Sequence, residues 1–143
     1  MLFRSGGGIA FRAKRNSSGT QTVYGAIDVA KENAAGNDYR GSLRFWTNQN
    51  ATGIPLERMR LDASGNLGLG VTPSAWASTR KAIEIGKVGA AISSGGNATE
   101  ISIGGNAYDA SGGWTYASSN ASTLYQQTSG QHAWYTEIGR AHV

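Results

Sequence analysis

The side chains of this sequence best suited to acid–base chemistry are carboxylates spread widely along the chain. The candidates are Asp28, Asp38, Asp62, Glu84, Glu100 and Asp109. Glycoside hydrolysis usually relies on two Asp or Glu residues placed on either side of a sugar bond. Nothing in the spacing of these acids selects such a pair. Glycosidase chemistry therefore stays an alternative without assigned residues.

Other catalytic and ligand-binding patterns are weak. His132 is accompanied by no nucleophile-elbow pattern, so the sequence does not predict a Ser-His-Asp triad. The glycine-rich residues 65–70 are not followed by the helix of a βαβ unit, which argues against a phosphate or dinucleotide cradle. The acids and His132 show no metal-ligand spacing. We therefore expect no enzyme activity, no cofactor and no metal site.

Aromatic residues in the second half of the chain offer a binding chemistry instead. Flat apolar rings with polar tips can stack on sugars or anchor a protein partner. The competing interpretation is that these rings fill a small core or an interface between chains, because a chain poor in aliphatic residues needs aromatic area to bury. The candidate receptor or glycan contacts are Trp114, Tyr116, Trp134 and Tyr135, and Tyr125 belongs to the same aromatic group.

The composition indicates a β-rich chain that completes its core by association. Leu, Ile, Val and Phe account for 24 of the 143 residues, which is below the share with which a lone globular chain usually builds a core. The net charge is only +4, and this favours association over disorder. The 21 glycines favour short strands and tight turns. We expect a mostly β, elongated chain.

Cysteine and charge usage exclude several classes of protein. The chain has no cysteine, so neither disulfides nor thiolate metal sites can stabilise it. No apolar run approaches the ~20 residues that a membrane-spanning helix needs. Arg12, Lys14 and Arg15 form the main cationic cluster, which is more typical of a solvated sheet edge than of a phosphate-binding track. We therefore expect neither nucleic-acid binding nor membrane insertion.

Secondary-structure elements must position these candidate residues. Residues 57–70 carry the most informative pattern for such elements. They read ERMRLDASGNLGLG. Glu57, Met59 and Leu61 alternate with charged residues, as in a half-buried strand with Glu57 on the apolar face. We interpret the two arginines between them as members of an ion-pair ladder between chains.

The second half of this segment predicts a turn and another short strand. Residues 62–66 have turn chemistry, with an Asp at the start and a glycine free to adopt positive φ. The glycines that follow carry no side chain, which predicts the close approach of another backbone. A neighbouring identical chain is the natural candidate. The residues expected to pack in such a shared shaft are Met59, Leu61, Leu67, Gly68, Leu69 and Gly70.

Residues 57–72 closely resemble the ERMRIDSSGNVGIGTT-type repeat of bacteriophage tail fibres and tailspikes. Leu61 and Leu69 stand where Ile is more usual, and Val71 stands where Thr is more usual. Residues 41–47, GSLRFWT, are similar to the strand that commonly precedes this repeat. The repeat is often found upstream of a self-cleaving chaperone domain. The resemblance implies a parallel homotrimeric fibre segment with a core shared between chains.

The resemblance also implies a function and a set of partners. The shaft of a tail fibre spaces and orients a host-recognition element, so the expected role is structural and contributes to host-cell attachment. The expected partners are identical chains, other tail or baseplate proteins, and a glycan or protein on the host surface. The expected location is the virion, with synthesis in the host cytoplasm. The alternatives are a fragment of a polysaccharide-degrading tailspike and a prophage-derived bacterial surface adhesin.

The sequence predicts three sections before an anomalous tail. Residues 1–72 are expected to form a β-repeat shaft module, and residues 73–81 a short helical or linker segment. Residues 82–136 are expected to form a second β-rich module, incomplete and interpreted as a knob. The strands are expected at residues 9–11, 24–30, 42–47, 56–62 and 67–71 in the first module, and at residues 82–85, 100–103, 114–117, 124–127 and 132–136 in the second.

The last residues read IGRAHV at positions 138–143. A widely used sequencing adapter encodes this run in one frame, and its next codon is a stop. Glu137 fits the same frame. We therefore predict that residues 137–143 are a non-native, adapter-derived tail, and that the protein is a fragment.

Overall fold

The computed structural model describes residues 7–49, 53–95, 99–111 and 113–136, and within these ranges the chain is all-β, without a helix. The chain forms two compact units, Met1–Ala63 and Ser64–Val143. The sequence analysis predicted the end of the first module at residue 72. The predicted adapter-derived tail, residues 137–143, lies outside the described residues.

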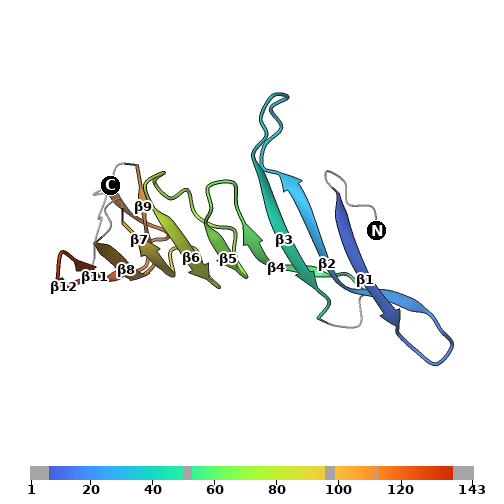
Figure 1. The fold of residues 1–143 in the computed structure, drawn as a ribbon. Coiled ribbons are helices and arrows are strands. Elements are labelled where there is room, and N and C mark those ends of the chain that lie inside the picture. Colours follow the sequence, from blue (N-terminus) through green and yellow to red (C-terminus); the bar gives the residue numbers. More distant parts are fainter. Residues whose placement is uncertain (1–6, 50–52, 96–98, 112, 137–143) are drawn as a thin grey trace. The chain divides into compact units, whose positions relative to one another are not determined.

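The first unit contains four antiparallel strands, each paired with the next along the chain (Figure 1). Asn16 organises the turn after the first strand, because its side-chain oxygen accepts the N–H of Thr20 at 3.1 Å. Gly19 adopts a φ of 83° in the same turn, which glycine tolerates without strain. The strands are β1 (Gly8–Lys14), β2 (Gln21–Lys31), β3 (Gly41–Thr47) and β4 (Leu56–Leu61).

A β-bulge changes which residues share a face in β4. Phe45 pairs with Met59, but the next residue in β3, Trp46, pairs with Glu57. Arg58 is the extra residue, so Glu57 joins the face of Trp46 rather than that of Met59. The prediction that Glu57 shares a face with Met59 is therefore wrong, because strict alternation does not hold across a bulge.

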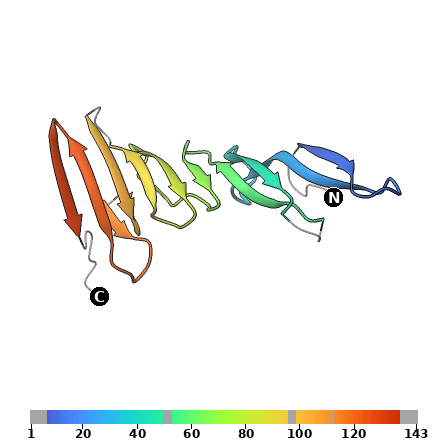
Figure 2. The ribbon, with the colours of Figure 1, turned by 90° about the horizontal axis from the view of Figure 1, so that it is seen from below.

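The second unit is built on a six-stranded sheet with a separate two-stranded hairpin. The sheet order is β5-β6-β7-β8-β11-β12, and β9 and β10 form the hairpin. The first two sheet strands are parallel and the others antiparallel. The strands of this unit run from green to red in Figure 2. The sequence did not predict β7 or β9. The strands are β5 (Leu67–Leu69), β6 (Lys81–Ile85), β7 (Ala91–Ser94), β8 (Glu100–Gly105), β9 (Ala107–Ala110), β10 (Gly113–Tyr116), β11 (Thr123–Thr128) and β12 (Gln131–Thr136).

Residues 72–80 contain no helix, so of the two predicted alternatives, a short helix or a linker, the helix is wrong. The N–H of Ser74 donates to the carboxylate of Glu84 at 2.6 Å. The N–H of Ala77 donates to the carbonyl of Asp109 at 2.7 Å. Because these donors are bound by β6 and β9, the segment runs over the sheet instead of coiling on itself.

The apolar core of the second unit is an aromatic cluster over small side chains. The ring of Trp76 packs edge-on against Tyr108 and Trp114, with centroids 6.0 and 6.2 Å apart. Ala82 and Ala91 of the sheet lie in the same buried cluster. Their small side chains leave room for the indole, so this core depends on aromatic rather than aliphatic area.

Gly68 is closely approached by its own chain. A Cβ at this position would lie 2.0 Å from the carbonyl oxygen of Val71 and 2.9 Å from Cδ of Pro73. The expectation that a neighbouring chain approaches this bare backbone is therefore corrected, because residues of the same chain fill the space. Gly70 has a different requirement, a φ of 72°, in the left-handed region that favours glycine.

The Gly68→Ala substitution is expected to lower the free energy of unfolding by ~1–3 kcal/mol, because the new methyl group must displace backbone atoms. Thermal and urea unfolding followed by circular dichroism would measure this loss. Gly104→Ala is the matched control in the same unit, since its Cβ would meet nothing nearer than 3.6 Å. Equal stability of the two variants would contradict the close approach at Gly68.

Candidate functional site

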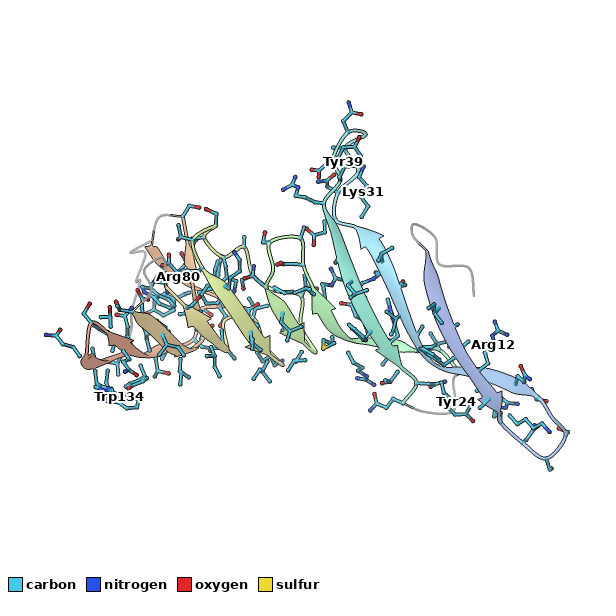
Figure 3. The ribbon with its side chains drawn as sticks, viewed as in Figure 1. Arg12, Tyr24, Lys31, Tyr39, Arg80 and Trp134 are labelled. Atoms are coloured by element: carbon cyan, nitrogen blue, oxygen red, sulfur yellow. The ribbon has the colours of Figure 1, made fainter. Side chains whose placement is uncertain are left out.

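The two faces of the six-stranded sheet carry opposite kinds of side chain. The face next to residues 72–80 is covered, and its residues in β6, β7 and β8 are small or polar. The open face carries aliphatic side chains, six of which stay 36% to 54% exposed. Figure 3 shows Arg80 on the covered side and Trp134 on the open side. The buried small and polar residues of the covered face include Ala82, Glu84, Ala91, Ser93 and Ser102.

Strand register places the apolar residues of the open face directly opposite one another. Ile83 pairs with Ile92, and Ile92 pairs with Ile103. Side chains directly opposite on neighbouring strands are in contact range. The row continues from β5 to β12 without a charged residue. This cross-strand row consists of Leu67, Ile83, Ile92, Ile103, Tyr125 and Trp134.

Further aliphatic residues widen the row into a surface. Leu69 pairs with Ile85 beside the row, and both are exposed. Ile101 lies on the same face of β8, also exposed. A contiguous apolar patch of this kind is typical of an interaction surface rather than of solvated surface.

The first unit repeats this arrangement. Ile9 pairs with Ile27, and Ile27 pairs with Phe45. The row ends at Met59 in β4. A second row on the same face runs through Val29, Leu43 and Leu61, which are all exposed.

The opposite face of the first unit is organised by a buried carboxylate. Asp28 accepts hydrogen bonds from Nε and Nη2 of Arg44 at 2.9 and 2.6 Å. The indole N–H of Trp46 donates to the same carboxylate at 2.8 Å. The guanidinium of Arg44 also lies 5.0 Å from the centre of the Trp46 ring. This charged network is satisfied within the chain, so the apolar face is the one that the described part of the chain leaves exposed.

The arginines of β4 are also bound within the chain. Nε and Nη2 of Arg60 donate to the carboxylate of Glu57 at 2.6 and 2.8 Å. The hydrogen bond to Glu57 raises the pKa of Arg60 above its ordinary value. Arg58 donates to Thr47 and Gln49. Both arginines therefore have partners in their own chain, in place of the ion-pair ladder between chains that the sequence analysis expected.

A second buried ion cluster holds the covered face of the second unit. Nη1 of Arg80 lies 2.7 Å from Oε1 of Glu100, and Nε of the same guanidinium donates to Asp109. The guanidinium also lies 4.9 Å from the centre of the Trp114 ring. Burial opposes ionisation of Glu100. The hydrogen bonds from Arg80, Gln126 and Ser102 and the charge of Arg80 outweigh this and lower the pKa of Glu100.

The candidate acids are therefore held by structural contacts. The carboxylate of Glu84 accepts three hydrogen bonds, from the N–H and hydroxyl of Ser74 and from the N–H of Gly89. Asp38 accepts hydrogen bonds from Arg40 and Asn33, which hold its pKa well below the usual range. Among the described residues, no group of three or more His, Asp or Glu side chains gathers in a way that could hold a metal ion.

The structure separates the predicted aromatic candidates. Trp114 packs inward against Trp76 on the covered face, and Tyr116 is half-buried in the hairpin. Tyr135 pairs with Leu124, which places it on the face opposite to Trp134. Trp134 is 81% exposed and stands at the end of the cross-strand row.

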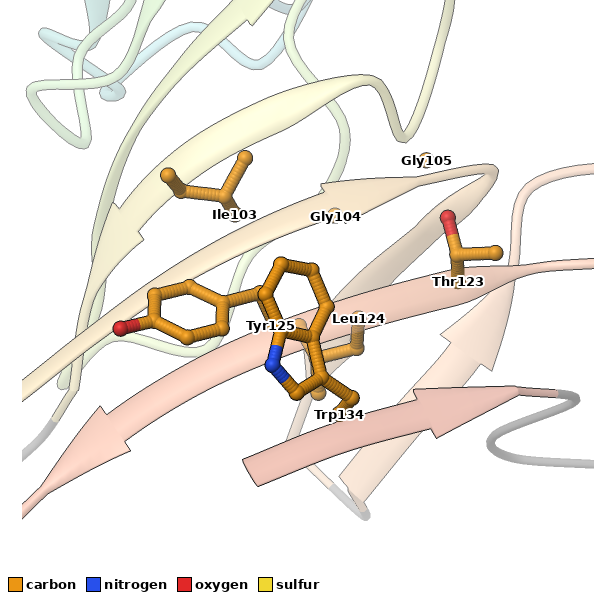
Figure 4. Close-up of a pocket in the computed structure, with 7 residues that line it drawn as sticks. All are labelled: Ile103, Gly104, Gly105, Thr123, Leu124, Tyr125 and Trp134. Atoms are coloured by element: carbon orange, nitrogen blue, oxygen red, sulfur yellow. The ribbon is translucent and has the colours of Figure 1, made fainter. Parts of the chain in front are cut away.

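A shallow recess of about 470 Å³ lies beside Trp134 on the open face. Figure 4 shows the rings of Tyr125 and Trp134 next to each other, with Gly104 and Gly105 leaving β8 without side chains. The ring centroids are 4.6 Å apart. The hydroxyl of Tyr125 is also hydrogen-bonded to Nδ1 of His132. We call this region, with Ile103, Thr123 and Leu124, the aromatic recess.

Comparison with known proteins finds no matching family model, no matching curated protein and no matching solved structure. The structure also contains no helix among its described residues that is long and apolar enough to cross a membrane.

Glu100→Gln is expected to lower stability at neutral pH by about 1–3 kcal/mol, because Arg80 loses one of its two buried anionic partners. Since the folded state lowers the pKa of Glu100, its ionised form stabilises the fold above the ordinary Glu pKa. This stabilisation is lost as the pH falls through the folded value. Thermal unfolding from pH 7 to pH 3 would measure it. The variant should show a shallower pH dependence than the wild type, and parallel curves would contradict the assignment.

Proposed function

We propose that this chain is a structural segment of a bacteriophage tail fibre, in which three parallel copies bury the aliphatic parts of their open faces against one another. The observation that carries the proposal is the pair of uncharged apolar rows, one in each unit, on faces that the described residues leave exposed. The fibre segment contributes to host-cell attachment by spacing and orienting recognition elements.

The energetics favour covering these faces. Fully burying an Ile or Leu side chain is worth about 1.5–3 kcal/mol relative to leaving it exposed. The open-face aliphatic side chains are already half-buried by their neighbours. Covering them completely would therefore add roughly half of that free energy for each side chain. Summed over the rows of several chains, this is enough to offset the entropic cost of association.

A second copy of the same chain is the partner that the rows fit best. Parallel, in-register copies related by a symmetry axis bring each row residue against its own counterpart. Such homotypic contacts are favourable for Ile92 and Ile103, whereas charged residues in the row would repel their copies. The charged residues Asp28 and Arg44 lie on the other face of their sheet, bound to each other.

The resemblance of residues 57–72 to the tail fibre repeat supports the biological setting. In that setting the segment belongs to the virion, is made in the host cytoplasm, and connects to other tail or baseplate proteins. Identical surfaces on three copies multiply weak contacts with a host-surface glycan or protein through avidity.

Ile92→Glu is expected to prevent association, because three carboxylates would meet at one level of the shared core. Light scattering should give about three times the chain mass of 15.0 kDa for the wild type and the mass of one chain for the variant. Circular dichroism should show that the variant keeps its strands, since Ile92 is 40% exposed within its own chain.

Ser119→Glu is the control for this experiment, because Ser119 is exposed in the turn before β11. It should associate like the wild type. A monomeric wild type, or an Ile92→Glu variant that still forms trimers, would overturn the proposal.

A further inference from the structure

The chemistry of the cross-strand row changes at its C-terminal end. From β5 to β8 every member is a branched aliphatic residue, whereas β11 and β12 contribute Tyr125 and Trp134. The exposed fraction changes with it, from 40% for Ile92 and 49% for Ile103 to 81% for Trp134. Since β12 pairs with β11 alone among the described strands, Trp134 has a neighbouring strand on one side.

The surface at this end is also hollow. Gly105 lies beside Ile103 on the open face of β8 and has no side chain there, and the neighbouring Gly104 adds further bare backbone. The rings of Tyr125 and Trp134 stand beside this backbone, with planes 47° apart, so they form the wall of the recess rather than a flat layer (Figure 4). A flat apolar layer suits packing against a second sheet, whereas a concave site with aromatic walls suits a small ring-shaped ligand.

The ring of Tyr125 is held in place by its neighbours. Its hydroxyl is hydrogen-bonded to His132, and its ring centroid lies 5.8 Å from that of His132. Ring positions fixed before binding reduce the entropy lost when a ligand arrives. The Tyr125 side of the recess is therefore pre-organised.

The residues that line the recess define the chemistry of its ligand. None of the seven carries a charge: Ile103, Gly104, Gly105, Thr123, Leu124, Tyr125 and Trp134. The hydroxyl of Thr123 and the indole N–H of Trp134 offer neutral polar contacts beside an apolar wall. A neutral pyranose ring has the matching character, with an apolar face of C–H groups and hydroxyls at its rim.

We propose that the aromatic recess is a binding site for a neutral saccharide, with one pyranose ring stacked on Trp134 and bordered by Tyr125. This inference rests on the proposed attachment function and names the chemical class of its partner. The site is small, so each copy binds weakly, and three copies on one fibre supply the avidity.

The test uses the full chain labelled with ¹⁵N at its tryptophan indoles. The probe is a panel of neutral oligosaccharides built from glucose, galactose and N-acetylglucosamine. The four Trp residues give separate indole signals, and Trp134→Phe assigns that of Trp134. At least one oligosaccharide should shift the Trp134 signal and leave that of the inward-packed Trp114 in place. Trp134→Ala should weaken its binding at least tenfold.

Tyr39→Ala is the matched control, because Tyr39 is 97% exposed in the first unit and should not affect binding. Light scattering on Trp134→Ala separates the two proposals. Loss of saccharide binding while the mass of the assembly stays unchanged supports a saccharide site. Loss of association instead assigns the recess to contacts between copies and overturns the inference, as does the absence of a shift with every oligosaccharide. A monomeric wild type that still binds saccharide overturns only the trimer proposal.

Discussion

A carboxylate without access to solvent must have its charge satisfied by hydrogen bonds from the protein, and Glu84 places this demand at the centre of the second unit. Its side chain is fully buried and accepts hydrogen bonds from Ser74 and Gly89. These bonds hold residues 72–80 over one face of the sheet, where Trp76 then covers the alanines beneath it. Because polar satisfaction determines which face is covered, the aliphatic residues are left on the other.

The sequence predicted most strands because alternation of apolar and polar residues survives in much of their length. It missed β7 and β9, because the four-residue runs AISS and AYDA are too short to give a clear periodic signal. It placed Glu57 on the wrong face because one extra residue, Arg58, reverses the alternation. For residues 73–81, the helical alternative was based on proline and capping preferences, which depend on local sequence alone. The segment instead donates hydrogen bonds to Glu84 and Asp109. These acceptors lie further along the chain, so no local pattern predicts the bonds.

The candidate site was predicted only in part, for a related reason. Composition indicated that the chain has too little aliphatic area for a core of its own. In the structure, much of the aliphatic area that it does have lies exposed on the open faces. The row that joins Ile83, Ile92 and Ile103 depends on strand register, and local sequence patterns do not reveal how strands pair. Likewise, Trp114 and Trp134 have similar surroundings in sequence, and only the fold turns one toward Arg80 and the other toward solvent.

The uncovered rows also have a consequence for the time course of biosynthesis. A newly made chain exposes β-branched side chains next to the unpaired edges of β1 and β12, and such surfaces promote non-specific strand pairing. In the proposed trimer, productive association and aggregation would compete for the same exposed face, and both would depend on chain concentration. The yield of assembled protein would then depend on the relative rates of these two reactions, and fast, local encounter of sister chains would protect the open apolar faces.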